Sequence, residues 1–299
     1  MLEGDSNTNF FHLSANGRRR KKSILSLEDT GGPTTDPEKI QGLIYSYYKQ
    51  LFGKQPHRTV SLSELAWGEH GMLTAGEIAS LILPFSEEEV KHAVFDMKID
   101  SAPDPDGFSI SFYRGCWDTI KGDLMDLIND FYRGNLDIKK LNYSVITLVP
   151  KIKEANNVKQ FRPICLLNVN FRIFTKLLMD KLAVLMDKLV SNNQTAFIKG
   201  RYVLDGSVIL HETMHELSSK KMRGVILKID FEKAYDSVDW DFVKGILKRK
   251  ELPKQMVDWI MSTVRGGGCV LISMEKMAPI SKHTGGLGRE THYLPCSLT

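Results

Sequence analysis

Apolar residues recur every three or four positions in several parts of the chain, which is the pattern of helices that bury one face. One helix is predicted over 37–52, a second begins after the S-x-x-E capping sequence of Ser86 and Glu89, and a third ends near Gly134. A long helix is expected on the apolar stripe Phe171, Phe174, Leu177, Leu178, Leu182, Leu185, Met186 and Leu189. Further helices are expected through about Leu217, over 240–250 and from Pro253.

Two stretches rich in β-branched and apolar residues predict strands instead. The first is Tyr143–Val149, which Pro150 ends, and the second is the buried run GVILKI at 224–229, which ends at Asp230. The stretch SAPDPDGF at 101–108 is expected to be a loop, because its prolines and glycine do not continue a helix. This mixture predicts an α/β (α+β) fold, with an antiparallel sheet that carries helices on one face.

Composition narrows the class of protein. The chain has 299 residues, of which 42% are hydrophobic and 25% charged, as in an ordinary globular protein of one or two domains. No apolar run reaches the roughly 18 residues of a membrane span, and the polar N-terminus is unlike a secretory signal. The four cysteines lie far apart without metal-ligand spacing. We therefore expect reduced cysteines in an intracellular protein of the nucleus or cytoplasm, without a membrane partner.

Positive charge is concentrated in one part of the chain. Residues 139–201 hold 12 Lys or Arg against 3 Asp or Glu, whereas the whole chain carries a net charge of only +4. A second basic run spans residues 18–22. Such clusters suit a polyanion such as nucleic acid, but a solvated surface and a nuclear-import signal explain them equally well.

The segment VILKIDFEKAYDSVDW at 225–240 holds the candidate chemistry. A strand that delivers the carboxylate of Asp230 at its end suits polynucleotide synthesis, in which two Mg²⁺ ions bridge the attacking oxygen and the triphosphate. The backbone carbonyl of Phe231 is a candidate second ligand, and the ring of Tyr235 is placed to clash with a 2′-hydroxyl and so to select dNTPs. The plainer alternative is that Asp236 or Asp239 only caps the next helix.

Four sequence blocks resemble the reverse transcriptases of LINE-type (non-LTR) retrotransposons. IDFEKAYDSVDW resembles their first catalytic aspartate motif, D-x-x-K-A-F/Y-D-S/K-V, and SAPDPDGF resembles their S-A-P-G-P-D-G-F turn. LVPKIKEANNVKQFRPICLLNVNFRIFTKLL resembles a block built on L-I-P-K and F-R-P-I-S-L, and SNNQTAFIKGRYVLDG resembles the block Q-x-A-F-x-x-G-R. GDSNTNFFHLSANGRRRKKSI resembles the segment between endonuclease and polymerase in plant elements. In this order the blocks cover roughly residues 4–272.

The resemblance implies the fingers and part of the palm of a right-hand polymerase, preceded by a helical lead-in. We expect the lead-in over 1–83, a partial reverse transcriptase domain over 84–272, and within it fingers over 84–223 and the start of the palm over 224–272. The implied function is RNA-directed DNA polymerisation with Mg²⁺ and dNTPs on an RNA template with a DNA primer. The sequence identifies no protein partner.

The resemblance also assigns roles to individual residues. Asp230 becomes the first catalytic metal ligand, together with the Phe231 carbonyl, and Tyr235 becomes the sugar gate. Lys151 and Arg162 are expected to contact the triphosphate or the template backbone, because Arg offers a planar fork to phosphate oxygens and Lys a compact charge. Residues expected along the template path are Gln194, Lys199 and Arg201.

Two departures from the family pattern stand out. Asp104 replaces a glycine of the turn, which costs little where the backbone φ is positive. The tail 273–299 lacks the expected G-L-R-Q-G-D-P-L-S-P and F/Y-A-D-D motifs, but codons for GGLGRETHYLP read one base earlier can encode the first of them. We therefore expect a frameshift near Ser273, and a 299-residue chain that does not extend a primer by itself.

Three other interpretations stay open. The chain is alternatively a non-catalytic nucleic-acid-binding remnant, whose affinity would fall steeply with salt. It is alternatively a pseudogene product without a cellular role. A group II intron-like maturase also carries a reverse transcriptase domain, but the plant-type lead-in and the missing splicing domain argue against it.

Overall fold

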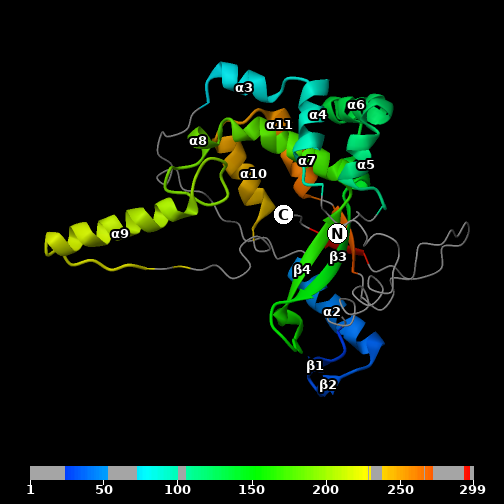
Figure 1. Cartoon of the computed structure of the whole chain (residues 1–299), viewed down its shortest axis with the longest axis vertical. Helices are drawn as coiled ribbons and strands as arrows, with labels where there is room; N and C mark the ends of the chain where they lie inside the picture. Colours follow the sequence, from blue (N-terminus) through cyan, green and yellow to red (C-terminus); the bar gives the residue numbers. More distant parts are fainter. Residues whose placement is uncertain are drawn as a thin grey trace, which may run out of the picture.

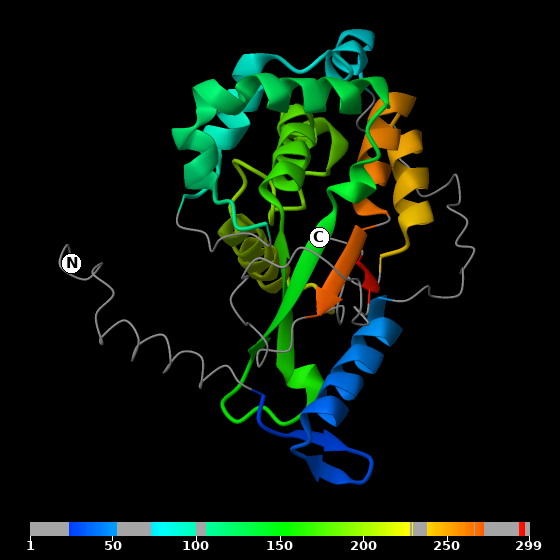
Figure 2. The same ribbon diagram turned by 90° about the vertical axis from the view of Figure 1, so that its right-hand side faces the viewer.

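The computed structural model describes residues 24–52, 73–99, 106–227, 229, 238–265, 267–271 and 293–296. Helices gather at one end of the described chain and a long two-stranded hairpin runs from them toward the other end (Figures 1 and 2). The mixture of helices and strands confirms the predicted α+β class.

A four-stranded sheet lies at the centre, in the order β4-β3-β5-β6. Its strands are β3 (Tyr143–Pro150), β4 (Phe161–Leu167), β5 (Gly267–Leu271) and β6 (Tyr293–Cys296). β3 pairs with β4 and β5 with β6 in antiparallel fashion, but β3 and β5 run parallel. The expectation of a purely antiparallel sheet is therefore wrong. A parallel pair needs a long crossover, and the helices between β4 and β5 supply it.

The hairpin of β3 and β4 follows from its side-chain alternation. Ile146 and Leu148 of β3 and Phe161 of β4 are buried on one face, while the intervening residues reach the other face. The Pro163 ring has no N–H to donate, and this is tolerated because β4 is the edge strand of the sheet. A short 3-10 helix, η4 (Val158–Gln160), lies in the connection between the two strands.

Ten α-helices are described in the ranges above. α2 (Pro37–Phe52) lies beside the small hairpin of β1 (Leu27–Asp29) and β2 (Gly32–Thr34) (Figure 1). The remaining α-helices are α3 (Ala75–Leu81), α4 (Glu87–Asp96), α5 (Ile110–Gly115), α6 (Trp117–Arg133), α7 (Val169–Ala183), α8 (Met186–Leu189), α9 (Val203–Ser219), α10 (Trp240–Arg249) and α11 (Lys254–Val264). η3 (Ile138–Lys140) is a second 3-10 turn.

The helix-end signals in the sequence act as predicted. Ser86 and Glu89 form a reciprocal capping box at the start of α4. α6 ends at Gly134, whose φ of 77° is the left-handed conformation that closes helices. Asp106 accepts a hydrogen bond from the backbone N–H of Phe108, and Gly107 has a φ of 83°, so both residues shape a turn as expected.

The core is built around α7. Phe174 of α7 packs against Phe131 of α6 with ring centroids 5.0 Å apart, and Phe131 in turn lies 5.6 Å from Trp259 of α11. All three side chains are buried. α4, α6, α7 and α11 thus share one hydrophobic cluster, which fixes the root of the β3–β4 hairpin.

Two sequence predictions need correction, and one strand was not predicted. The long helix through Leu189 breaks after Ala183, where exposed Val184 precedes the separate short helix α8. FRPICLL, to which the sequence pattern assigned no element, is strand β4. The predicted strand GVILKI is absent from its described part: Val225 is 96% and Leu227 78% exposed, in irregular backbone. A buried strand needs hydrogen-bonding neighbours, and β3 pairs with β4 and β5 instead.

Among the described helices, none combines the length and the apolar character that crossing a membrane requires.

Candidate nucleic-acid interface

Lys151 and Arg162 lie on the same exposed face of the β3–β4 hairpin. Val149 pairs with Arg162 in the antiparallel register, and the backbone N–H of Lys151 donates to the Gln160 carbonyl at 2.8 Å, which continues that register by one residue. Lys151 is therefore a diagonal neighbour of Arg162, at the roughly 7–8 Å typical of such positions. Both side chains are exposed, and the opposite face of the hairpin is buried.

The two cations differ in their local contacts. The Lys151 ammonium donates to the Lys159 carbonyl at 3.1 Å, which holds the side chain along the hairpin connection. The Arg162 guanidinium has no ion-pair partner among the described residues. This face thus offers a compact ammonium and a planar fork, the two donor types that bind phosphate oxygens.

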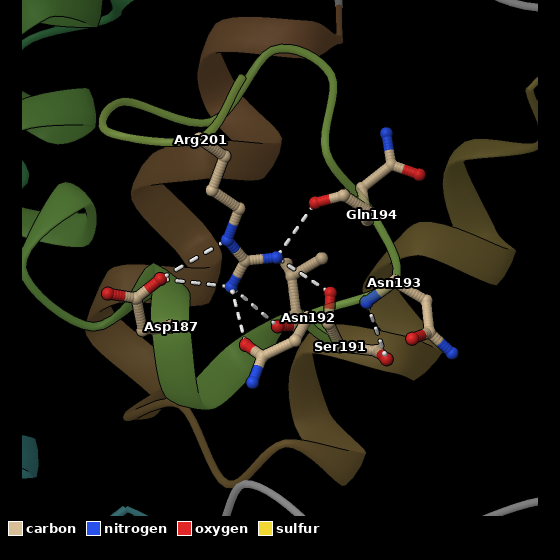
Figure 3. Close-up of polar contacts among 7 residues, drawn as sticks. Asp187, Ser191, Asn192, Asn193, Gln194 and Arg201 are labelled. Atoms are coloured by element: carbon tan, nitrogen blue, oxygen red, sulfur yellow. Dashed lines mark hydrogen bonds and ion pairs between the residues drawn. The ribbon is translucent and has the colours of Figure 1, made fainter. Parts of the chain in front are cut away.

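Arg201 organises the loop that joins α8 to α9. Its guanidinium donates to Asp187 Oδ1 at 2.9 Å and to the carbonyls of Ser191 and Gln194 at 2.6 and 2.8 Å (Figure 3). It also reaches the Val190 carbonyl at 3.0 Å and the Asn192 side chain at 3.4 Å. The side chain is only 11% exposed. Arg201 therefore points into its own loop, and these contacts give no support to its predicted role on the template path.

Gln194 and Lys199, the other residues predicted along that path, lie on the surface of the same loop. Gln194 Nε2 donates to the Ala196 carbonyl at 3.1 Å, and its backbone carbonyl is one of the acceptors of Arg201. Lys199 is exposed and makes no ion pair within the described ranges, although its charge helps to lower the pKa of Asp96. The structure thus brings Gln194, Lys199 and Arg201 into one loop, and Lys151 with Arg162 into the hairpin.

Four cations of the 139–201 segment form ion pairs with carboxylates of the described residues. Lys176 of α7 lies 2.6 Å from Asp96 and 2.9 Å from Asp180, and Lys181 lies 3.7 Å from Glu89. The hydrogen bond from Lys176 lowers the pKa of Asp96. Burial lowers the pKa of Lys176, but its hydrogen bonds to the two aspartates outweigh this effect and leave it raised.

A further pair ties α8 to α3. Lys188 lies 2.5 Å from Glu77, and its hydrogen bond, with those from Thr74, lowers the pKa of Glu77 to about 2. Lys176, Lys181, Lys188 and Arg201 are engaged in these pairs. The exposed cations of the segment are Lys139 and Lys140 in η3, Lys151, Lys153, Lys159 and Arg162 on the hairpin and its connection, and Lys199 on the loop. The number of Lys and Arg residues in the segment is therefore larger than the number of cations available to bind phosphate.

Asp230, Phe231 and Tyr235 lie outside the described residues, so the metal and sugar-gate assignments stay predictions. Asp239, just beyond them, accepts hydrogen bonds from Asp241 and Phe242 at 2.7 and 3.0 Å and caps α10, which confirms the plainer interpretation for that residue. Within the described part of the chain, no group of three or more His, Cys, Asp or Glu side chains is placed to hold a metal ion.

Two features of the loop were missed by sequence reasoning. Phe197 is 90% exposed and has a φ of 63°, an uncommon conformation for an aromatic residue. Its signal in the sequence is an aromatic residue three positions before Gly200, in a segment expected to be a loop. The acceptors of Arg201 are mostly backbone carbonyls, which leave no signal in residue identity.

Comparison with known proteins agrees with the motifs. The family described as reverse transcriptase (RNA-dependent DNA polymerase) matches residues 149–285, a range that begins in β3 and runs past Ser273. A 149 kDa uncharacterized protein of transposon TX1 from Xenopus laevis is 26% identical over 285 residues, which are 94% of this chain and 22% of that protein.

Two further relatives come from R2 retrotransposable elements. A Pol polyprotein of a type-1 element from Nasonia vitripennis is 29% identical over 64% of this chain and 18% of its own length. That of the type-2 element R2DM from Drosophila melanogaster is 27% identical over 58% of this chain and 16% of its own length. The chain thus spans about a fifth of the length of these curated relatives. Residues 149–285 are therefore similar to the reverse transcriptase domain, and the relatives are proteins of non-LTR retrotransposons.

Proposed function

We propose that this chain provides the fingers and the first metal-binding carboxylate of an RNA-directed DNA polymerase that copies a primed RNA template with dNTPs. The main support for the proposal is that Lys151 and Arg162 are diagonal neighbours on one exposed face of the hairpin, in a segment that matches reverse transcriptases. On the opposite face of the hairpin, Ile146, Leu148 and Phe161 are buried and belong to the hydrophobic cluster. The two cations therefore stand on a supported platform rather than on a free loop.

Lys151 and Arg162 have a defined part in this function. The guanidinium fork suits two oxygens of one phosphate, and the ammonium, held near the Lys159 carbonyl, suits a neighbouring phosphate. Because both side chains are long, cations at diagonal positions roughly 7–8 Å apart can reach toward a common strand or triphosphate. Neither cation needs to break an ion pair of the described chain before it binds.

Asp230 and the Phe231 carbonyl are proposed to hold Mg²⁺. Their donor chemistry fits, because carboxylate and carbonyl oxygens are the ligands that this hard cation prefers. When bound, the metal ion would neutralise triphosphate charge. The described carboxylates add no further ligand cluster, so the proposed metal site depends on residues around 230. The role of the chain itself is to bring the triphosphate, held by Lys151 and Arg162, toward that carboxylate.

Tyr235 is proposed to select the sugar. Its ring would occupy the space of a 2′-hydroxyl, so that a deoxyribose fits and a ribose does not. Replacement of Tyr235 by alanine is expected to reduce the preference for dNTP over NTP.

Template-dependent retention of a nucleotide tests the proposal. A primed RNA template would be incubated with the protein, Mg²⁺ and the complementary dNTP, and complex lifetime would be measured by fluorescence anisotropy after addition of competitor. The complementary dNTP should lengthen the lifetime more than a mismatched dNTP or the matching NTP. Asp230→Asn should remove this effect of Mg²⁺ and dNTP while leaving binding of the template itself intact. Equal lifetimes with matched and mismatched nucleotides would contradict the proposal.

A second function, nucleic-acid binding without catalysis, is favoured by one observation. The run before Asp230 is exposed and irregular in its described part, with Val225 96% exposed, and so provides no sheet to hold the carboxylate. In the same experiment, salt-sensitive template binding without any nucleotide effect would support this second function.

A further inference from the structure

We propose that His211 and His215 of α9 bind a transition-metal ion such as Zn²⁺, and that the ion bridges two turns of a helix in which no residue is buried. The proposal goes beyond the polymerase function, because it uses other residues and another class of metal. Imidazole nitrogen suits Zn²⁺, Cu²⁺ and Ni²⁺, whereas the Mg²⁺ proposed for Asp230 prefers oxygen ligands.

The two histidines have the spacing of a helical metal site. The segment HETMH at 211–215 has the pattern H-E-x-x-H, and the structure places all of it inside α9, which spans Val203–Ser219. Residues four apart lie on one face of a helix, about one turn from each other. Both imidazoles can therefore reach one ion without a change in the backbone.

Both histidine side chains are accessible. α9 projects from the helical cluster (Figure 1), and His211 and His215 are exposed. Among the described residues, neither imidazole forms a hydrogen bond or an ion pair. An ion that binds them therefore displaces only solvent.

The charge of the helix favours a cation. α9 contains three carboxylates, those of Asp205, Glu212 and Glu216, and neither Lys nor Arg. Lys220, just beyond the helix, pairs with Glu216 at 2.5 Å, and Glu212 has no ion pair within the described ranges. Glu212 precedes His215 by three residues, so the two side chains are neighbours on the helix surface. Its carboxylate can accept the second ring N–H, which is the usual support of a metal-bound histidine.

The site offers two protein ligands. Metallopeptidases with the same H-E-x-x-H spacing use a third ligand, and in the described part of the chain no group of three or more His, Cys, Asp or Glu side chains is placed to hold an ion. The residues thus account for ion binding and not for peptide hydrolysis. Because the two ligands come together only when the turn between them is helical, a bound ion stabilises that turn.

Zn²⁺ binding, measured by competition with a fluorescent zinc indicator, tests the proposal. His211→Gln and His215→Gln should each weaken binding more than about tenfold, since the loss of a group that only supports a ligand already costs about that much. Glu212→Gln should cause a smaller loss than either. The matched control is His92→Gln, at an exposed histidine of α4, which should bind like the unchanged protein. Mg²⁺ should not displace the bound Zn²⁺.

A rearranged variant separates geometry from composition. Thr213→His combined with His215→Thr keeps two histidines but places them about 200° apart around the helix, so that they cannot share an ion. This variant should bind Zn²⁺ as weakly as His215→Gln. In the unchanged protein, free Zn²⁺ at about a hundred times its Kd should slow amide exchange at His215 about a hundredfold. The rearranged variant should show no such slowing.

Three results would overturn the inference. The first is absence of Zn²⁺ binding by the unchanged, folded protein. The second is Zn²⁺ binding that survives both single histidine changes at unchanged helix content, which would place the ion elsewhere. The third is Zn²⁺ binding that occurs only together with a dimer in sedimentation, which would assign the ligands to two chains instead of one helix. None of these results bears on Lys151, Arg162 or Asp230, so the proposed function is tested separately.

Discussion

Helices α7 and α9 are of similar length and both are rich in apolar residues, but their surroundings differ. Six residues of α7 are buried, whereas none of the 17 residues of α9, all of which the structure describes, is buried. α9 projects from the helical cluster as an arm, and the irregular segment with Val225 and Leu227 follows it (Figure 1). The spacing of apolar residues thus predicts that a helix forms. Whether its apolar face is buried depends on whether another element packs against that face.

The two helices also differ in how their charges are used. Lys176 and Lys181 of α7 reach across to Asp96 and Glu89 on α4, so they join separate elements. Lys220, next to α9, pairs with Glu216 one turn away at 2.5 Å, which stabilises the helix itself only slightly. The apolar face of α9 is therefore held by neither packing nor inter-helix ion pairs of the described residues.

The largest difference between the two helices is expected when one apolar residue of each is truncated and the loss of stability is compared. Phe174→Ala in α7 leaves a cavity beside Phe131 and should lower the free energy of unfolding by about 3–5 kcal/mol. Leu204→Ala in α9, at a side chain that is 74% exposed, should change it by less than about 0.5 kcal/mol. Urea unfolding followed by circular dichroism measures both. Equal losses would mean that α9 is packed in solution and would break the comparison.

Arg201 lies in the loop between α8 and α9. Substitution of Arg201 should have the next largest effect, on the stability of that loop. Arg201→Lys keeps the charge but not the planar fork, so the hydrogen bonds to Asp187, Ser191 and Gln194 cannot all form. Because hydrogen bonds to charged groups contribute about 1.5–3 kcal/mol, amide exchange in the loop 191–200 should accelerate more than tenfold. Lys199→Arg, at an exposed neighbour, is the matched control. Unchanged exchange in Arg201→Lys would show that other contacts hold the loop.

Helix capping gives a smaller contrast. Ser86→Ala removes the side-chain acceptor at the start of α4 and should cost about 1 kcal/mol. The same replacement at exposed Ser218 in the last turn of α9 removes no cap and should change stability by less than about 0.5 kcal/mol. Thermal unfolding of the two variants makes the comparison, and a Ser86→Ala variant as stable as Ser218→Ala would contradict the role of the cap.

Low pH should reduce the stability of the protein through protonation of Glu77, and this is the smallest of the expected effects. The pKa of Glu77 is lowered from 4.5 to about 2 by its hydrogen bonds from Lys188 and Thr74. A carboxylate with a lowered folded-state pKa stabilises the protein above its unfolded pKa, and this contribution is lost as pH falls from 4.5 toward 2. Glu77→Gln should therefore weaken the dependence of Tm on pH in that window.

The pair gives its own control for this prediction. When Lys188→Gln is already present, adding Glu77→Gln should change the pH dependence less than it does in the unchanged protein, because the principal hydrogen-bond donor is gone. Full additivity of the two changes would show that the lowered pKa has another cause.

Local sequence signals predicted most elements but not their partners. The capping box of Ser86, the left-handed Gly134 and the β-branched run of β3 all depend on neighbouring residues, and these elements formed as predicted. FRPICLL was not predicted as a strand. Pro163 is unfavourable in a central strand but is tolerated in an edge strand, and only the sheet order shows that β4 is at an edge. GVILKI was predicted as a strand from composition, which contains no information about whether a neighbouring strand is present.

The candidate site shows the same division. The motifs identified Lys151 and Arg162, but only the register of β3 and β4 places them as diagonal neighbours on one face. The predicted place of Arg201 on the template path came from the family resemblance, whereas its guanidinium contacts Asp187 and backbone carbonyls of its own loop. Residue type thus identified groups able to bind phosphate, and the three-dimensional structure decides which of them remain available.

The most direct test of the central claim is the salt dependence of RNA binding by a hairpin variant. Lys151→Ala combined with Arg162→Ala should weaken binding and lower the slope of log Kd against log salt by about 1.4, the value for two phosphate contacts on a single strand. Lys248→Ala combined with Lys254→Ala makes the same change in charge at exposed residues of α10 and α11 and should leave the slope unchanged. Equal slopes for the two double variants would contradict the assignment of the hairpin face to nucleic acid.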